Sequence, residues 1–202
     1  VELSPEDMAS QPPPARDGTT YAAFLAERGR TDSRATRLIW IFDKTMGATG
    51  TFEKRHLRIA LDLDRDPTGV PEEMVVDSFL SDVQRHRRMG RYLSRGKLAF
   101  LDGDTLYTHA SLKKEGFLTI PGRSSKSKSK SVRAWVDELN TWYDKAIGRY
   151  FDTLSQYEKG EASVDALRAV AKPLKDYSDA AEGLTDNPAS VAFARDIDAN
   201  KM

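Results

Sequence analysis

The sequence contains no cysteine, which excludes disulfide bridges, thiolate metal sites and a cysteine nucleophile. It also lacks a net charge, because 31 Lys and Arg side chains balance 31 Asp and Glu. The global charge therefore draws the chain neither to nucleic acid nor to an anionic membrane, although local patches remain possible. No apolar run approaches the roughly 18 residues of a membrane span, and no basic-then-apolar leader opens the chain. We expect a cytoplasmic or organellar protein, not a secreted one.

Several catalytic signatures are missing as well. There is no glycine-rich phosphate loop of the G-x-x-x-x-G-K or G-x-G-x-x-G type. Neither H-E-x-x-H nor the G-x-S-x-G elbow of a serine hydrolase occurs. The residues that would carry catalysis are therefore unknown from motifs alone.

What is present suits a globular chain. Its 202 residues and 22.6 kDa are enough for one full domain, or one domain with a small appendage. Hydrophobic residues make up 39%, which is too many for wholesale disorder. The first residue is Val1 rather than Met, so we expect a processed, trimmed or partial product.

Apolar side chains at helical spacing predict that most of the chain is helical. A short helix begins after Thr19 or Thr20 and ends at Gly29, since capping residues and glycine mark those positions. Pro173 is expected to end the last long helix, with one or two further turns after it. The intervening helices are expected over 32–47, 51–63, 71–96, 132–158 and 161–172.

The pattern changes after Lys97. Two β-prone runs, Leu98–Leu101 and Thr105–His109, flank Asp102-Gly103, and Asp-Gly between such runs is a strong hairpin signal. We therefore predict an α/β fold, mostly helical around a β-hairpin. The second strand brings His109 to its C-terminal end, where it is either a structural histidine or a site residue at the rim of the sheet.

Composition divides the chain into an irregular lead-in (1–18), a main part (19–183) and a weakly apolar tail (184–202). Within the main part, 123–131 reads Arg-Ser-Ser-Lys-Ser-Lys-Ser-Lys-Ser and is expected to be a flexible basic loop. It is either a solvated insertion or a phosphorylatable or anion-binding loop. The basic run 85–95 similarly suits an exposed helix face or phosphate groups. His56 and His86 are expected on the surface.

Three segments of the chain resemble calcineurin-like metallophosphoesterases, the family that includes serine/threonine phosphatases. Lys97–Leu112 (KLAFLDGDTLYTHASL) resembles the strand that ends in a metal-ligating histidine in that family. Thr45–Ala48 with Thr51–Arg55 resembles a helical insert of a protist-type branch, and Trp135–Trp142 (WVDELNTW) resembles the helix after the metal-binding strand. The similarity extends roughly from residue 20 to residue 150.

The resemblance implies the C-terminal portion of an αββα sandwich, with His109 as a metal ligand and 19–183 as a partial metallophosphoesterase-like domain. The family hydrolyses phosphate esters with a pair of divalent metals (Mn, Fe, Zn or Mg). However, its earlier motifs, Asp-x-His, Gly-Asp-x-x-Asp-Arg-Gly and Gly-Asn with His or Arg-Asp, do not occur here, nor does a later histidine. Ala110-Ser111 also stands where the family usually has glycine.

Because a two-metal centre needs several converging donors, we expect this chain alone to be inactive. Upstream residues would complete the site around a phosphorylated substrate, or the domain has lost it and serves as a scaffold or protein-interaction subunit of a larger assembly. An unrelated helical binding domain is the third interpretation. We expect neither sequence-specific nucleic-acid binding nor a membrane span.

Overall fold

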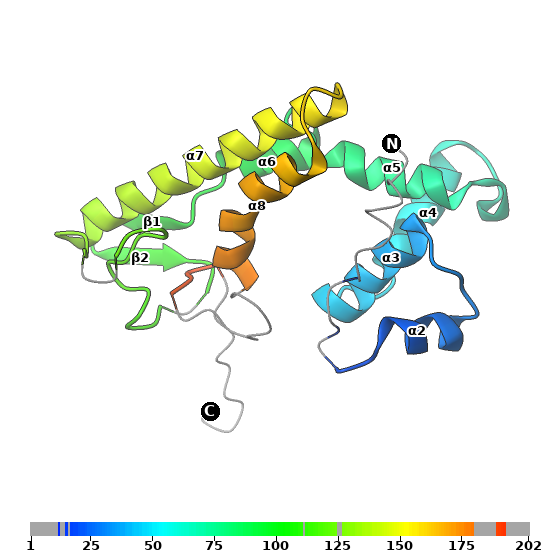
Figure 1. Ribbon diagram of the computed structural model, residues 1–202, viewed down its shortest axis with the longest axis horizontal. Coiled ribbons are helices and arrows are strands. Elements are labelled where there is room, and N and C mark those ends of the chain that lie inside the picture. The colour runs from blue at the N-terminus through cyan, green and yellow to red at the C-terminus, as the bar shows by residue number, and fades with distance from the viewer. Residues whose placement is uncertain are drawn as a thin grey trace. The chain divides into compact units, whose positions relative to one another are not determined.

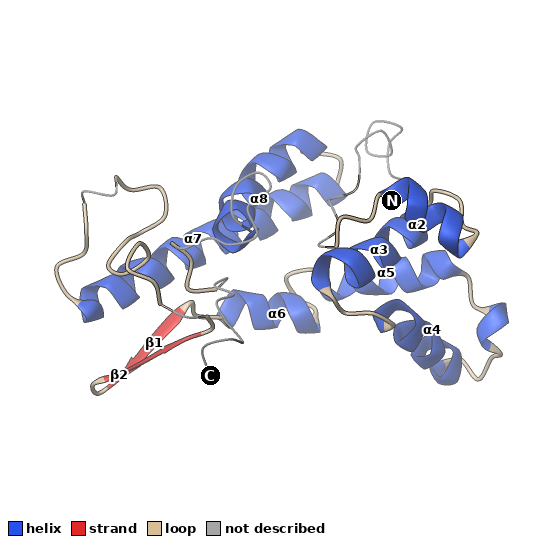
Figure 2. Cartoon of the chain, turned by 90° about the horizontal axis from the view of Figure 1, so that it is seen from below, coloured by secondary structure: helices blue, strands red, loops and turns tan. Residues whose placement is uncertain are grey.

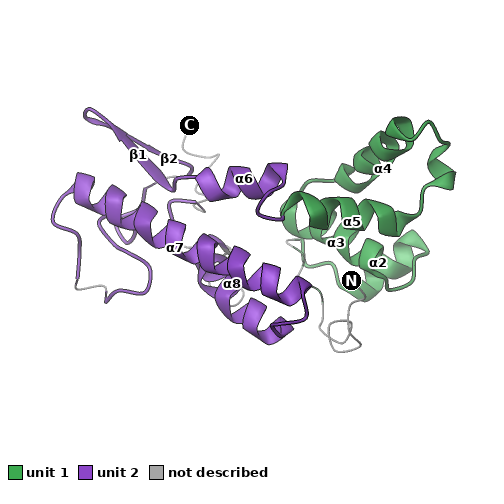
Figure 3. Ribbon diagram, turned by 90° about the horizontal axis from the view of Figure 1, so that it is seen from above, with its two compact units in different colours: residues 1–83 green, residues 84–202 purple. Residues whose placement is uncertain are grey.

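The computed structural model describes residues 12, 15, 17–110, 112–124, 127–179 and 189–192. Most of the predicted lead-in and tail lies outside these residues. The chain forms two compact units, residues 1–83 and 84–202 (Figures 1 and 3). The described residues are mostly helical with a single β-hairpin (Figure 2), which confirms the coarse α/β class.

The first unit is built from short helices. They are α2 (Tyr21–Arg28), α3 (Arg34–Trp40), a π-helix η1 (Ile41–Met46), α4 (Thr51–Asp62), a 3₁₀ turn η2 (Pro67–Gly69) and α5 (Glu72–Asp82). At α2 the ends are set by the capping residues that the sequence predicts. The Thr20 hydroxyl accepts a hydrogen bond from Ala23 N at 3.1 Å, and Gly29 ends α2 in the left-handed conformation.

Trp40 lies at the centre of this unit. Its ring meets Phe24 edge-on at 5.2 Å between centroids, and both side chains are fully buried. Helix α3 supplies Ile39 to the same core, while α4 and α5 supply Phe52 and Val75. The apolar run of α3 is thus buried against several neighbours, as its sequence predicts.

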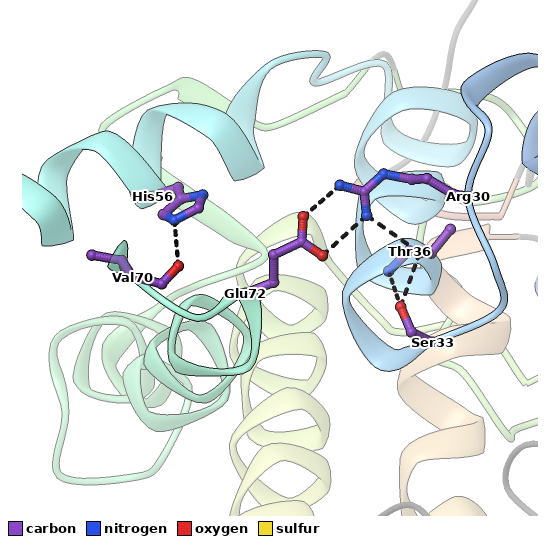
Figure 4. A network of polar contacts seen from close by, with 6 residues as sticks. All are labelled: Arg30, Ser33, Thr36, His56, Val70 and Glu72. Carbon is purple, nitrogen blue, oxygen red and sulfur yellow. Dashed lines mark hydrogen bonds and ion pairs between the residues drawn. The ribbon is translucent and has the colours of Figure 1, made fainter. Parts of the chain in front are cut away.

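An ion pair ties the start of α5 to the loop before α3. The Arg30 guanidinium donates to both carboxylate oxygens of Glu72 and also to the Thr36 hydroxyl (Figure 4). The Arg30 hydrogen bonds lower the pKa of Glu72. Nearby, His56 Nε2 lies 2.8 Å from the Val70 carbonyl oxygen, so His56 is half-buried and bonded rather than freely solvated as predicted.

The second unit contains α6 (Arg88–Arg95), β1 (Ala99–Asp102), β2 (Thr105–Thr108), α7 (Val132–Glu158) and α8 (Val164–Asp179). The strands are antiparallel, with Phe100 opposite Tyr107 and Asp102 opposite Thr105. The hairpin is therefore confirmed, and its two-residue turn is Gly103-Asp104. In Figure 1 the hairpin runs beside the first half of α7, and α8 lies against the second half.

Two predicted helix boundaries are wrong. The helix expected over 71–96 is interrupted, since α5 ends at Asp82 and α6 begins at Arg88. Gly90 allows the close turn between them, because a Cβ there would lie 1.9 Å from the Gln84 carbonyl oxygen. Pro173, in turn, lies inside α8 rather than ending it. Its ring tolerates the helical φ although its backbone donates no hydrogen bond.

The core of the second unit surrounds the first half of α7. Trp135 and Leu139 are fully buried, and Trp135 Nε1 donates to the Thr119 carbonyl at 2.9 Å. Tyr177 on α8 stacks at a tilt on Trp142, 5.1 Å between centroids, and its hydroxyl accepts from Val191 N at 3.0 Å. Residues 189–192 are thereby attached to this core. Within the described residues, no helix has both the length and the apolar character to cross a membrane.

Candidate functional site

His109 lies one residue beyond the end of β2. Exposure alternates along this strand, so that Thr105, Tyr107 and His109 are exposed while Leu106 and Thr108 are half-buried. Side chains at alternate positions share a face of a strand. His109 therefore continues the exposed face of the hairpin.

The backbone around His109 is fixed on both sides. The Thr108 hydroxyl donates to the Ala110 carbonyl at 2.7 Å, and Ala110 N donates to the Val191 carbonyl at 2.8 Å. These bonds hold the end of β2 against 189–192. The position of the His109 backbone is thus set by the fold, while its exposed side chain is available for binding.

The exposed face of the hairpin is aromatic. Phe100 and Tyr107, directly opposite each other, have ring centroids 6.2 Å apart and remain 59% and 55% exposed. The other face is covered, since Ala99 is buried and Leu101 and Leu106 pack on the α7 core. A two-stranded hairpin is marginally stable by itself, and an apolar face left in water is typical of a surface that binds another group or chain.

The metal site that the sequence suggests does not fit this chain alone. No group of three or more His, Cys, Asp or Glu side chains that could hold a metal ion occurs among the described residues. His109 offers one imidazole, and a metal pair needs several donors at once. No protein-family model, curated protein or solved structure matches the chain. The functional argument therefore depends on the geometry of these residues.

The basic run 85–95 contributes to a hollow between α6 and α7. This hollow has a volume of about 390 Å³. Two of its bases are paired with carboxylates, Arg85 with Asp152 at 2.6 Å and Lys97 with Asp144 at 2.9 Å. The residues around it are Arg85, Ser94, Arg95, Lys97, Asp144, Ile147, Gly148 and Phe151.

The side chains around this hollow are suited to binding a small anion rather than to catalysing a reaction. The charges of Arg85 and Lys97 are balanced by their carboxylate partners, so Arg95 leaves the hollow with an excess positive charge. The Ser94 hydroxyl donates within its own helix, to the Gly90 carbonyl oxygen at 2.7 Å. Arg87 lines a second, smaller hollow with the exposed His86. The structure thus brings only part of the predicted basic cluster together.

Lys97 and Gly148 at the hollow were not singled out from the sequence. Gly148 is a glycine inside the longest helix, where an added Cβ would meet nothing within 4 Å. Glycine lowers the stability of a helix interior, so its presence in the middle of a predicted helix could have marked this position. His109 lines neither hollow.

Proposed function

We propose that the chain is a portion of a metal-dependent phosphoesterase that hydrolyses phosphate esters, with His109 as one metal ligand. One observation supports this most: an exposed imidazole, on a fixed backbone, continues the uncovered aromatic face of a hairpin. The resemblance of Lys97–Leu112 to the metal-binding strand of calcineurin-like enzymes supports the same assignment. The fuller αββα sandwich, with a second layer covering Phe100 and Tyr107, belongs to this proposal.

In this proposal the chain positions a donor and does not itself catalyse. The hairpin register and the Ala110–Val191 bond hold the strand end, and a neutral His109 would present a ring nitrogen to a metal. The paired divalent metals would supply Lewis acidity and a nucleophilic hydroxide when bound. The remaining ligands must come from outside this chain, so the chain alone should be inactive.

The test compares this chain with the longest product of its coding sequence. Both are titrated with Mn²⁺ by calorimetry and assayed with p-nitrophenyl phosphate. We expect turnover only in the longer product, and a loss of at least about 100-fold in its H109A variant, as for a lost metal ligand. The H86A variant, which removes another exposed histidine, should keep its turnover. Undiminished turnover in H109A would refute the role of His109.

A second candidate is a catalytically degenerate scaffold or interaction subunit. It is favoured by apolar side chains left in water on α4, where Leu57 is 51% and Leu61 77% exposed. Residues four apart share a helix face, so these leucines form one patch. This candidate requires that the longer product neither binds Mn²⁺ tightly nor hydrolyses the ester, although it folds. Metal-dependent turnover would reject it.

A further inference from the structure

The segment 123–131 is here named the basic strap. Its charged side chains, and that of Arg133 in the first turn of α7, are all positive. From Gly116 to Val136 the sequence has five basic side chains and no acidic one. In a chain without net charge, this is a local concentration of positive charge. The proposal that follows is independent of the phosphoesterase assignment.

The strap is held against the second unit through Ser129. Its backbone N donates to the Leu118 carbonyl at 2.9 Å, and its buried hydroxyl donates to Glu138 Oε2 at 2.9 Å. Lys128 Nζ donates to the Phe117 carbonyl at 3.0 Å. Anchoring of this kind reduces the conformational entropy that a ligand must remove on binding.

One carboxylate near the strap is already engaged. Glu138 accepts from Ser129 and from Arg123, and these hydrogen bonds lower its pKa. Its charge offsets that of Arg123. Glu138 also interacts electrostatically with Lys130, and the exposed Asp137 lies one helical turn after Arg133. The five bases of 123–133 outnumber these two carboxylates, so positive charge remains in excess. Lys128, Lys130 and Arg133 are all exposed. Neither Lys130 nor Arg133 has a side-chain hydrogen bond or ion pair with any other described residue.

The side chains around these bases narrow the class of ligand. The strap contains no apolar residue. Of its apolar neighbours, Ile120 is buried, and Phe117, Leu118 and Val132 are half-buried against the α7 core. Nothing at the strap can therefore insert into a bilayer, which amphipathic membrane anchors require. It also has no aromatic ring on which an unpaired base could stack, as single-strand binders use. Lysine, arginine and serine are phosphate-contacting residues.

We propose that Lys128, Lys130 and Arg133 bind the sugar–phosphate backbone of double-stranded nucleic acid without sequence preference. Duplexes carry dense, regularly spaced negative charge, and binding releases their condensed counterions. The exposed hydroxyl of Ser127 lies within the same strap and is of the type that donates to phosphate oxygens.

The experiment measures fluorescence anisotropy of a labelled 20-base-pair duplex, in a DNA and an RNA version, between about 50 and 200 mM salt. The wild-type chain should bind both, with an affinity that falls steeply with salt. The triple variant K128A/K130A/R133A should bind at least about 10-fold more weakly. Its logarithmic salt slope should be smaller by about 3, one for each phosphate contact removed.

The control is K145A/R149A/K159A, which removes the same charge from exposed bases elsewhere in the second unit, outside the basic run 85–95. It should retain near wild-type affinity and slope. Circular dichroism checks that both variants are folded. Equal weakening by the two triple variants would overturn the proposal, as would absence of duplex binding at 50 mM salt. Stronger binding to phosphatidylserine vesicles or to single strands would also overturn it.

Discussion

The Asn140 side chain hydrogen-bonds to the backbone of Leu98 and Ala99 at the start of β1. Its Oδ1 accepts from Leu98 N at 2.9 Å and from Ala99 N at 3.4 Å, and its Nδ2 donates to the Ala99 carbonyl at 2.8 Å. The amide thus plays the part of a neighbouring strand's backbone, although it comes from α7. Buried backbone groups must be bonded, so Asn140 joins the hairpin to the long helix.

Replacing Asn140 by Asp tests this bridge. The carboxylate still accepts from Leu98 N, but it no longer donates to the Ala99 carbonyl and places a second acceptor against it. We expect N140D to lower the free energy of unfolding by about 1–3 kcal/mol, measured by urea denaturation. The matched variant N140A should lose a similar amount. Unchanged stability in both would show that the bridge does not contribute.

Tyr21 gives the first unit a dependence on alkaline pH. Its hydroxyl donates to Asp32 Oδ1 at 2.9 Å. Burial, followed by the bond to Asp32, raises the pKa of Tyr21 to about 12. The unfolded chain releases this proton near pH 10, so the native state retains more protons between pH 10 and 12.

Stability should therefore be fully present below pH 10 and decline as the pH rises toward 12. The measurement is the urea midpoint at pH 9 and at pH 11.5 for the wild type and Y21F. The phenylalanine variant lacks the titrating proton and should lose less stability over the same interval. An identical decline in both proteins would argue against this role of Tyr21.

At the level of elements, two helical glycines have opposite surroundings. A Cβ at Gly90 would lie 1.9 Å from the Gln84 carbonyl, whereas one at Gly148 meets nothing within 4 Å. We expect G90A to disrupt the turn before α6 and to lower the unfolding midpoint strongly. In contrast, G148A should stabilise the chain by about 0.5–1 kcal/mol, because alanine is the better helix former.

Both variants are compared by thermal unfolding, and the sign of the change is the decisive result. Destabilisation by G148A would mean that the hollow between α6 and α7 needs its open volume. Stabilisation by G90A would contradict the close backbone approach at Gln84.

The elements that local chemistry determines were predictable from the sequence. Thr20 and Gly29 mark the ends of α2, Asp102-Gly103 marks the hairpin, and α7 covers the predicted 132–158. The break before α6 was missed because the apolar spacing resumes at Met89, although residues 84–88 are all polar. The close approach of Gly90 to the Gln84 carbonyl is visible only in the structure. Pro173 inside α8 shows that packing overrides a local preference.

The candidate site was predictable only in part. The predicted hairpin placed His109 at the C-terminal end of its second strand, and the structure has it there, exposed. The backbone bond from Ala110, next to His109, to Val191 joins residues far apart in the chain, which no local pattern reveals. The same holds for the hollow of Lys97 and Asp144, which depends on how α6 packs on α7.

At the scale of the whole molecule, the two units have separate cores. The buried residues of one lie between Phe24 and Val76, and those of the other between Ala99 and Val191. Each unit therefore has its own source of hydrophobic stabilisation. A single two-state description need not apply to such a chain.

Scanning calorimetry should show two transitions with separate sensitivities. F24A should lower the midpoint temperature of one transition and L139A that of the other. Each substitution should remove about 2–5 kcal/mol of the unfolding free energy of its unit, because both side chains are fully buried. The untouched transition serves as the internal control in each variant. One common transition, shifted by both substitutions, would contradict independent cores.

The π-helix η1 has a consequence for the length of the chain. Between Ile41 and Met46 each turn holds about one residue more than an α-helix, and within it Asp43 pairs with Arg28 and Lys44 with Asp17. Deleting one residue here would restore ordinary helical winding and rotate all that follows by about 100°. Asp43 and Lys44 could not both keep their partners, so related proteins with these two ion pairs should carry neither a gap nor an insertion at this turn.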